Sequence, residues 1–342
     1  MRMVLTIDTP ALAGLLARVG VERFLRELAD RTEADFAKWP TFEKSARLAA
    51  HSKVGVLELM PTSNDEWFSF KLVNGHPGNP ARGLLTVTAI GMLAEVATGY
   101  PRLISEMTVL TALRTAATSA MAARRLANPG AKTMALIGTG AQSEYQALAF
   151  RACLGVNSIR YFDTDPAAMA KFARNLAASG LELAACASAA EALAGAEIIT
   201  TATAAKRTQV VLVDALVPAG VHINAIGGDC PGKTELDPKL LARARIFVEY
   251  LPQTRIEGDI QSLGPEAKAT ELWQVIAGNE PGRTSRQDLT IFDSVGFALE
   301  DYSALRYVYD KARELGIGRL LPLLPEPKDP KDLYGYVVGL GA

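Results

Sequence analysis

The chain of 342 residues is 49% hydrophobic and 21% charged, carries a formal net charge of −1, and is long enough for two domains. This near-neutral balance gives no reason to expect nucleic acid or an anionic membrane as a partner, and no apolar run approaches the roughly 18 residues that span a bilayer. Asp8 and Pro10 interrupt the segment where a secretory signal needs unbroken apolarity, and three cysteines are typical of a reducing compartment, so we expect a cytoplasmic protein.

Strand patterns dominate the middle of the first third of the chain. Segments bounded by turn residues predict three strands, at residues 54–60, 67–74 and 84–93. In the second strand, alternation places Lys71 on the same face as Ser69 and Val73. Residues 105–127 are rich in alanine and predict a long helix, which ends at the stop signal Asn128-Pro129-Gly130.

After this stop the pattern changes to alternating strands and helices. The predicted strands are residues 133–138, 159–163, 181–187, 197–204, 221–227 and 245–250, and the clearest helices are residues 141–155, 166–180 and 188–196. Residues 289–316 add one more strand and a long helix. Such alternation indicates a parallel sheet covered on both faces, a Rossmann-type doubly wound α/β fold. We therefore expect one domain at residues 129–305 and a second, α+β domain formed by residues 1–128 and 306–342.

A glycine-rich turn follows the first strand of the predicted parallel sheet. Gly138 permits a tight turn, and Gly140 lets backbone amides approach a pyrophosphate at the positive end of the next helix. Ser143 takes the place of the third glycine of this motif. Asp163 ends the following strand, where a carboxylate accepts hydrogen bonds from ribose hydroxyls and repels a 2′-phosphate. The ordered set predicts NAD binding rather than NADP binding; a glycine-rich turn that binds nothing is the weaker alternative.

Three cationic residues of the first domain lie in unusual surroundings. Lys71 lies inside a strand rich in Phe, Leu and Val, Arg114 inside a helix of Ala, Thr and Leu, and Arg47 just before an apolar strand. Each needs a partner, because an unpaired buried charge is costly. Glu58, in the middle of a strand, is one structural partner available to Lys71. Periodicity alone leaves two interpretations open, ion pairs within the protein or a site for an anionic group of a ligand.

Asp229 lies on the glycine-rich turn of NAIGGDCPGKTEL (residues 224–236), directly after a predicted strand. Aspartate is common in turns, so one interpretation is a turn former. The other is a reacting group, since ligands of doubly wound sheets bind at the carboxyl ends of the strands. The histidines and cysteines lack metal-ligand spacing, and we predict no metal site.

Five segments together resemble the ornithine cyclodeaminase/μ-crystallin family. They are residues 86–120, 137–150, 224–236, 247–261 and 292–308. The resemblance extends over roughly residues 40 to 310 and implies an NAD-dependent enzyme that converts L-ornithine to L-proline and ammonia without net redox change. It also implies a homodimer in which the N-terminal, substrate-binding domains pair through their sheets. Three alternatives stay open: a lysine cyclodeaminase, an NAD-dependent imine reductase or amino-acid dehydrogenase, and a binding protein without catalytic activity.

The same resemblance implies roles for individual residues. Arg47, Lys71 and Arg114 would hold the α-carboxylate of the amino acid, and Glu58 and Val295 would contact the rest of the substrate. Asp229 would act as the general base and acid for the reacting nitrogens. The expected cofactor contacts are Thr86, Arg114, Gly138, Gly140, Ala141, Gln142, Asp163, Thr203, Asn224, Gly227, Lys233 and Ser294.

Overall fold

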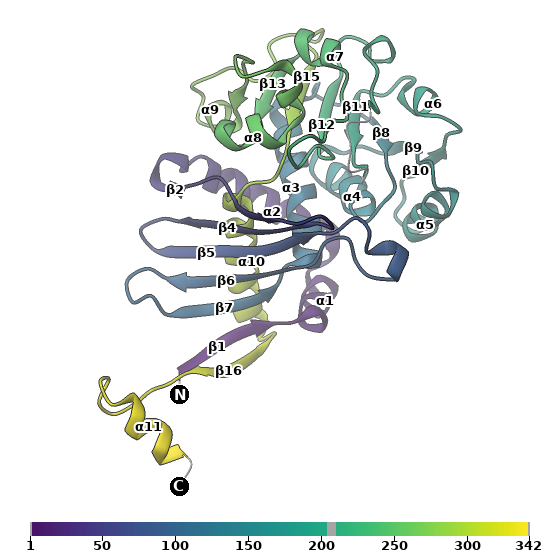
Figure 1. Cartoon of the computed structure of the whole chain (residues 1–342). Coiled ribbons are helices and arrows are strands. Elements are labelled where there is room, and N and C mark those ends of the chain that lie inside the picture. Colours follow the sequence, from purple (N-terminus) through teal and green to yellow (C-terminus); the bar gives the residue numbers. More distant parts are fainter. Residues whose placement is uncertain (1, 204–209, 341–342) are drawn as a thin grey trace.

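Two eight-stranded sheets organise the chain in the computed structural model, which describes residues 2–203 and 210–340 (Figure 1). The N-terminal sheet has the order β16-β1-β7-β6-β5-β4-β2, with β3 paired to β4. Its strands are β1 (Arg2–Ile7), β2 (Glu43–Lys44), β3 (Leu48–His51), β4 (Val56–Ser63), β5 (Trp67–Gly75), β6 (Ala89–Glu95), β7 (Pro101–Glu106) and β16 (Arg319–Leu324). The pairs are antiparallel except β1 with β7.

Helices cover only one face of the N-terminal sheet. Behind the sheet as drawn in Figure 1 lie α2 (Val21–Phe36), the long α3 (Thr108–Leu126) and α10 (Ala298–Leu315), with α1 (Thr9–Val19) beside them. In β5 the side chains of Ser69, Lys71 and Val73 are buried against this layer, whereas Leu72 on the other face is exposed. The apolar face of β5 is therefore the uncovered one, and the buried face contains a lysine.

The second sheet is parallel throughout, with the order β10-β9-β8-β11-β12-β15-β13-β14. Its strands are β8 (Thr133–Ile137), β9 (Ser158–Phe162), β10 (Glu182–Ala185), β11 (Ile198–Thr201), β12 (His222–Ala225), β13 (Arg245–Val248), β14 (Thr270–Glu271) and β15 (Thr290–Asp293). The helices are α4 (Ser143–Leu154), α5 (Pro166–Leu176), α6 (Ala189–Leu193), α7 (Pro238–Arg243), α8 (Leu251–Glu257) and α9 (Leu272–Ile276). This arrangement confirms the predicted doubly wound fold, because the chain builds the sheet outward from β8 in both directions, first to β9 and β10 and then to β11 and β12.

Several element boundaries differ from the sequence-based expectation. Residues 84–88 are exposed loop, and the strand expected at 84–93 begins only at Ala89, where alternate side chains become buried. The helix expected at 105–127 is preceded by β7, so its first residues belong to a strand and α3 starts at Thr108. The expected strand 197–204 forms β11 only to Thr201, and residue 204 lies outside the described residues. Of the two expected domain boundaries, 128/129 falls between α3 and β8, and 305/306 falls inside α10.

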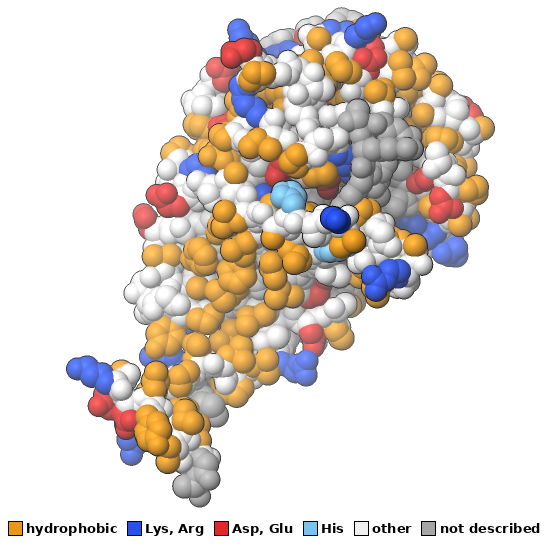
Figure 2. Space-filling model, in the orientation of Figure 1, with side chains coloured by type: hydrophobic (Ala, Val, Ile, Leu, Met, Phe, Trp, Pro, Cys, Tyr) orange, Lys and Arg blue, Asp and Glu red, His pale blue; other side chains and the backbone are white. Residues whose placement is uncertain are grey.

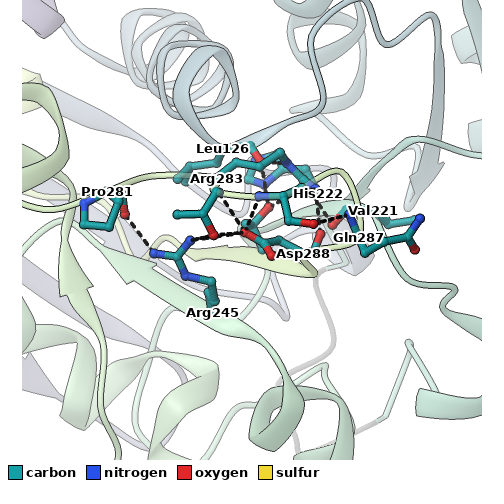
Figure 3. A network of polar contacts seen from close by, with 11 residues as sticks. Leu126, Val221, His222, Arg245, Pro281, Arg283, Gln287 and Asp288 are labelled. Carbon is teal, nitrogen blue, oxygen red and sulfur yellow. Dashed lines mark hydrogen bonds and ion pairs between the residues drawn. The ribbon is translucent and has the colours of Figure 1, made fainter.

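A polar network joins α3 to the amino ends of β12 and β15 (Figure 3). Arg283 donates hydrogen bonds to the carbonyl oxygens of Leu126 (2.7 Å) and Asp288 (2.6 Å) and to Thr290 Oγ1 (3.1 Å). His222 Nδ1 lies 2.9 Å from the same Thr290 hydroxyl. The pKa of His222 is lowered to about 3, mainly by burial and also by the nearby charge of Arg283, so the imidazole is neutral at pH 7. The network thus fixes the N-terminal helical layer to the parallel sheet at the edge remote from the strands' carboxyl ends.

None of the helices within residues 2–203 and 210–340 is both long enough and apolar enough to cross a bilayer.

Candidate active site

The turn between β8 and α4 requires its first glycine and leaves space at its second. Gly138 has a φ of +100°, and a Cβ there would lie 2.6 Å from the carbonyl oxygen of Ala202. A Cβ on Gly140 would meet nothing within 4 Å. The Asp163 carboxylate accepts hydrogen bonds from Thr139 N (2.6 Å) and Thr139 Oγ1 (3.1 Å). Asp163 therefore braces the turn from the end of the neighbouring strand.

This turn fits the diphosphate of a dinucleotide. No side chain caps the amino end of α4, and Gln142 Oε1 is buried without a hydrogen-bond partner among the described residues. Uncapped N–H groups at a helix start attract an anion, and the open space at Gly140 lets one approach the backbone. Each carboxylate oxygen of Asp163 has two lone pairs, so the hydrogen bonds to Thr139 leave capacity for ribose hydroxyls. Ala141, on the same turn, is exposed.

Asp229 projects from the turn after β12 beside a buried lysine. Its side chain is 54% exposed, and its Oδ1 lies 3.1 Å from the Nζ of Lys233, whose side chain is only 7% exposed. Lys233 Nζ also donates to the carbonyl oxygen of Thr203 (3.3 Å), at the end of β11. Thr203 Oγ1 in turn donates to Glu235, and burial raises the pKa of Glu235 to about 7 against that hydrogen bond. The carboxyl ends of β11 and β12 thus meet at Lys233, as expected for a ligand edge.

Hydrogen bonds from Gln261 hold this turn in place. Gln261 Oε1 accepts from Gly232 N (2.7 Å), while its Nε2 donates to the carbonyl oxygens of Lys233 (3.2 Å), Cys230 (3.4 Å) and Gly258 (2.8 Å). Gly227 and Gly228 are needed because a Cβ on either would collide with a carboxylate, that of Glu235 or Asp259 respectively. The turn that carries Asp229 is exposed at its tip and rigidly bonded at its base.

Arg47, Lys71 and Arg114 converge from three elements of the N-terminal domain. Arg47 pairs with Glu58 (3.0 Å) and Glu257 (3.1 Å). Its Nη2 also donates to the carbonyl oxygens of residues 295 (2.6 Å) and 296 (2.8 Å). A guanidinium has five N–H groups, and three of them make these hydrogen bonds; the Nε–H has no hydrogen-bond partner among the described residues, so two N–H groups remain for a ligand.

Asp301 of α10 pairs with the other two cations. It lies 2.8 Å from Lys71 Nζ and 3.1 Å from Arg114 Nε, and Arg114 Nη1 also pairs with Glu300. The pKa of Lys71 is lowered to about 8, mainly by burial and also by the charges of Arg114 and Arg47, while Asp301 opposes them. This mutual influence places the three cations in one electrostatic site.

The expectation that Glu58 pairs with Lys71 is wrong. Glu58 pairs with Arg47, and Lys71 pairs with Asp301, because α10 covers the buried face of β5 and brings its carboxylates to that lysine. The pair of Lys71 with Asp301 links residues 230 positions apart, which no local pattern specifies.

Several buried carboxylates of the site were not anticipated. Besides Glu300 and Asp301, Glu257 faces Arg47, and Glu249 accepts from Ser294 Oγ (2.5 Å). Burial raises the pKa of Glu257 to about 7; Arg47 opposes this, and the charges of Glu58 and Asp229 add to it. In the sequence these acids lie inside the stretches 247–261 and 292–308, among many apolar residues, and that position was the signal that could have identified them. Within residues 2–203 and 210–340, no group of His, Cys, Asp or Glu is arranged to hold a metal ion.

The remaining residues expected at the site lie in three places. Val295 is buried, with its carbonyl oxygen on Arg47. Thr86 belongs to the loop before β6, and its carbonyl oxygen accepts from His76 N (2.8 Å). Asn224 is fully buried in β12, where its side chain contacts His222 Nε2 (3.2 Å) and Thr200 Oγ1 (3.5 Å). The structure therefore gives Asn224 contacts inside the sheet, unlike Lys233 and Asp229 on the turn.

The chain is similar to proteins of one family over most of its length. The model of the ornithine cyclodeaminase/mu-crystallin family matches residues 11–316. An ornithine cyclodeaminase of Brucella suis biovar 1 (strain 1330) is 58% identical over 324 residues, which cover 95% of this chain and 90% of that protein.

Two solved structures resemble both sheets together. A lysine cyclodeaminase, described as recognising L-lysine, L-ornithine and L-2,4-diaminobutyric acid, has a TM-score of 0.88 and 33% identity, covering 97% of this chain and 99% of that one. An archaeal alanine dehydrogenase dimer with bound NAD has a TM-score of 0.86 and 30% identity, covering 94% and 100%.

Proposed function

The chain belongs to the ornithine cyclodeaminase/mu-crystallin family, and on that premise we propose that it is an NAD-dependent ornithine cyclodeaminase. It converts L-ornithine to L-proline and ammonia. The observation that carries this conclusion is the 58% identity to an ornithine cyclodeaminase over nearly the whole of both chains, well above the 33% identity to the lysine cyclodeaminase. The site has the charges that this substrate requires, three cations for one carboxylate and several carboxylates for two ammonium groups.

Arg47, Lys71 and Arg114 bind the α-carboxylate in this proposal. All three are buried, so an incoming carboxylate is attracted with little screening by water. Their ion pairs with Glu58, Glu257, Glu300 and Asp301 hold the cations in position before substrate arrives, which reduces the cost of organising the site. Val295 and Glu58 border the same space and contact the rest of the substrate.

Asp229 is the proton-transfer residue. Its exposed carboxylate on a rigid turn is free to accept a proton from a substrate ammonium group and to return it to departing ammonia. Lys233, 3.1 Å away, orients that carboxylate. One carboxylate serves both steps because the proton that it takes from one nitrogen of the substrate is the proton that it gives to the other.

The glycine turn and the edge of β11 and β12 would hold the cofactor. Gly138, Gly140 and Gln142 surround the place of the diphosphate, and Asp163 the ribose. Ala141 lies on the same turn and also borders the diphosphate. We assign the rest of the cofactor to the residues that follow the strand ends and to the clamp, namely Thr86, Arg114, Thr203, Asn224, Gly227, Lys233 and Ser294. Bound NAD supplies a reversible hydride acceptor at the substrate's Cα, so no net redox change results.

The decisive test is an assay of the purified protein with ornithine and lysine side by side. Ammonia, cyclic amino acid and NADH absorbance are followed together. Ornithine should give ammonia and proline in equal amounts with no accumulation of NADH. One methylene changes discrimination by only about 1–3 kcal/mol, so slower turnover of lysine is expected. Faster turnover of lysine would make the protein a lysine cyclodeaminase, and stoichiometric NADH would make it a dehydrogenase.

The protein acts as a homodimer in this proposal, in the reducing environment of the cytoplasm, to which its free cysteines are suited. The uncovered face of the N-terminal sheet is the proposed interface. We call it the outer face; its exposed apolar side chains are Leu57, Leu72, Leu85, Val87 and Ile90. Monomeric proteins rarely leave so large an apolar surface exposed.

A further inference from the structure

The last helix of the described chain is apolar on every side. α11 (Leu333–Leu340, LYGYVVGL) contains no charged residue and buries no side chain. Its large apolar side chains, Leu333, Tyr334, Val337, Val338 and Leu340, are 54–83% exposed. It extends from the edge of the N-terminal sheet beyond β16, away from the rest of the chain (Figure 1). The family model matches residues 11–316, so this arm lies outside the part of the chain that the model matches.

Such a helix needs a surface to cover it. Isolated helices of fewer than about 12 residues are marginal in water, and α11 has eight residues, two of them glycines that each cost about 1 kcal/mol relative to alanine. Helices that are hydrophobic all round are buried ones. The stability of α11 must therefore come from packing that a single copy does not provide.

The covering surface is a protein rather than a membrane. At about 1.5 Å per residue, eight residues extend roughly 12 Å, against the 20 or so residues that cross a bilayer. A helix that lies in the membrane surface has a charged or polar face, often rich in lysine or arginine, and α11 has none.

The outer face is a matching apolar surface on the same chain. Figure 2 shows hydrophobic side chains gathered over β4 to β7, and α11 is of the same kind. The outer face contains a hollow of about 650 Å³, lined by apolar side chains that include Leu57, Leu72, Leu85, Ile90 and Ile104. The chain thus has an apolar projection and an apolar hollow, neither of which is filled.

The geometry of β1 and β16 separates the two within one copy. β16 is antiparallel to β1, with Arg319 opposite Thr6 and Leu324 opposite Arg2, so the chain leaves the sheet at the Arg2 end. The hollow is bordered by residues 6–9, at the other end of β1. An ion pair of Arg2 with Glu326 (3.6 Å) directs the chain onward from the Arg2 end. In a dimer with a twofold axis, any contact of one arm with the other copy's outer face is made twice.

We propose that α11 is an exchanged arm, which packs on the outer face of the second copy and locks the dimer. This inference rests on the proposed homodimer and adds to it the contact that determines its strength. Two reciprocal helices add their own buried surface to that of the paired sheets.

Cross-linking between two differently tagged copies tests the exchange directly. One copy carries Val338→Cys and the other Leu57→Cys, and each single variant incubated alone is the control for the native cysteines. A disulfide-linked heterodimer is expected on oxidation. A link that forms only when both cysteines are in one chain would show that α11 folds back on its own sheet and would overturn the proposal, as would no link at all.

Sedimentation velocity over a dilution series measures what the arm contributes. Val337→Asp/Val338→Asp should raise the dimer dissociation constant at least tenfold. The matched control is Val213→Asp/Leu216→Asp, which places two charges on exposed apolar positions of the nucleotide-binding domain and should leave the constant unchanged. Equal constants for both variants would refute a locking role. Co-sedimentation of the wild type, but not of the α11 variant, with phosphatidylserine vesicles would assign the arm to a membrane instead.

These readouts are independent of catalysis. If wild-type protein released no ammonia from ornithine but the cross-link formed, the proposed activity would fail and the arm would stand. If ammonia were released and no cross-link formed, the reverse would hold.

Discussion

Asp229 and the three cations of the clamp differ in how deeply they are buried, and this difference suits their roles. The cations are buried and fixed by carboxylates, whereas Asp229 has a half-exposed side chain with one ion-pair partner, Lys233. A binding group benefits from rigidity and low dielectric, while a proton-transfer group needs access to the nitrogen that it serves. The buried, immobilised cations are therefore suited to binding, and the exposed Asp229 is suited to proton transfer.

Replacing Asp229 by Asn tests the proton-transfer role. The side chain is 54% exposed, so the fold should change in stability by no more than about 0.5 kcal/mol. General acid–base groups contribute 10²- to 10⁴-fold, and we expect kcat for proline formation to fall by at least about 10²-fold. NAD binding, followed by fluorescence titration, should be unchanged. Near wild-type turnover would remove Asp229 from the mechanism.

Lys71 gives the clamp a pH limit. Its pKa is lowered to about 8, mainly by burial, so the side chain loses its positive charge as pH rises through 8. Since the cation attracts the substrate carboxylate, KM for ornithine should rise above pH 8. A Lys71→Arg variant stays charged throughout this range and is the control that separates the effect from titration of ornithine itself. Identical pH profiles of kcat/KM for the two proteins would exclude Lys71 from the clamp.

At the scale of elements, the turn after β12 shows how backbone contacts support an exposed side chain. Gln261 alone makes four hydrogen bonds that reach both sides of this turn and the neighbouring residue Gly258. Asp259 accepts from Glu235 N (2.6 Å) and Leu236 N (2.9 Å), where the turn joins the following segment. The position of Asp229 is thus determined by residues 30 positions further along the chain.

Gln261→Ala should therefore lower kcat although Gln261 contacts no substrate in the proposed mechanism. We expect roughly a tenfold loss, because small displacements of a reacting group are costly, with NAD affinity unchanged. The matched control is Gln274→Ala on α9. It removes the single hydrogen bond that Gln274 accepts from the side chain of Asn279, and it should keep full activity. A loss of thermal stability in Gln261→Ala with kcat intact would indicate a purely structural role.

The polar network between α3, β12 and β15 makes stability depend on pH. His222 has a pKa of about 3 when folded, below its ordinary value near 6.5, so the unfolded chain binds the proton first. Stability from this group is complete above pH 6.5 and is lost as pH falls, by about 2 kcal/mol at pH 5. Urea unfolding of wild type and His222→Gln at pH 7 and pH 5 measures this: the variant, with no titrating ring, should lose less stability between the two. Equal losses would contradict the assignment.

For the molecule as a whole, local patterns predicted most of the parallel sheet, because most of its strands are short apolar runs ended by turn residues. The exception is β14 (Thr270–Glu271), which has no apolar residue and was not predicted. The strand–turn–helix order at Gly138 and the acid at Asp163 lie within 26 positions, so the nucleotide turn was visible in the sequence. The N-terminal sheet was predicted less well, since β1 and β16 pair across more than 300 residues. The clamp's partners come from α10, and only tertiary packing brings Asp301 to Lys71.

Cofactor binding should stabilise the whole molecule, because the glycine turn, β11 and β12 are each part of one packed sheet. At a concentration 100 times its dissociation constant, NAD would add about 2.7 kcal/mol and raise Tm by several degrees. Gly140→Val should abolish this shift without harming the fold, since a Cβ there meets no protein atom within 4 Å and the added methyl groups would occupy the space of the diphosphate. Gly14→Val, at an equally open position in α1, should keep the shift. NADP should give a much smaller shift in the wild type, because Asp163 repels its 2′-phosphate. A Gly140→Val protein that NAD still stabilises would mean that the diphosphate lies elsewhere, and the turn between β8 and α4 would then be a structural feature of the sheet alone.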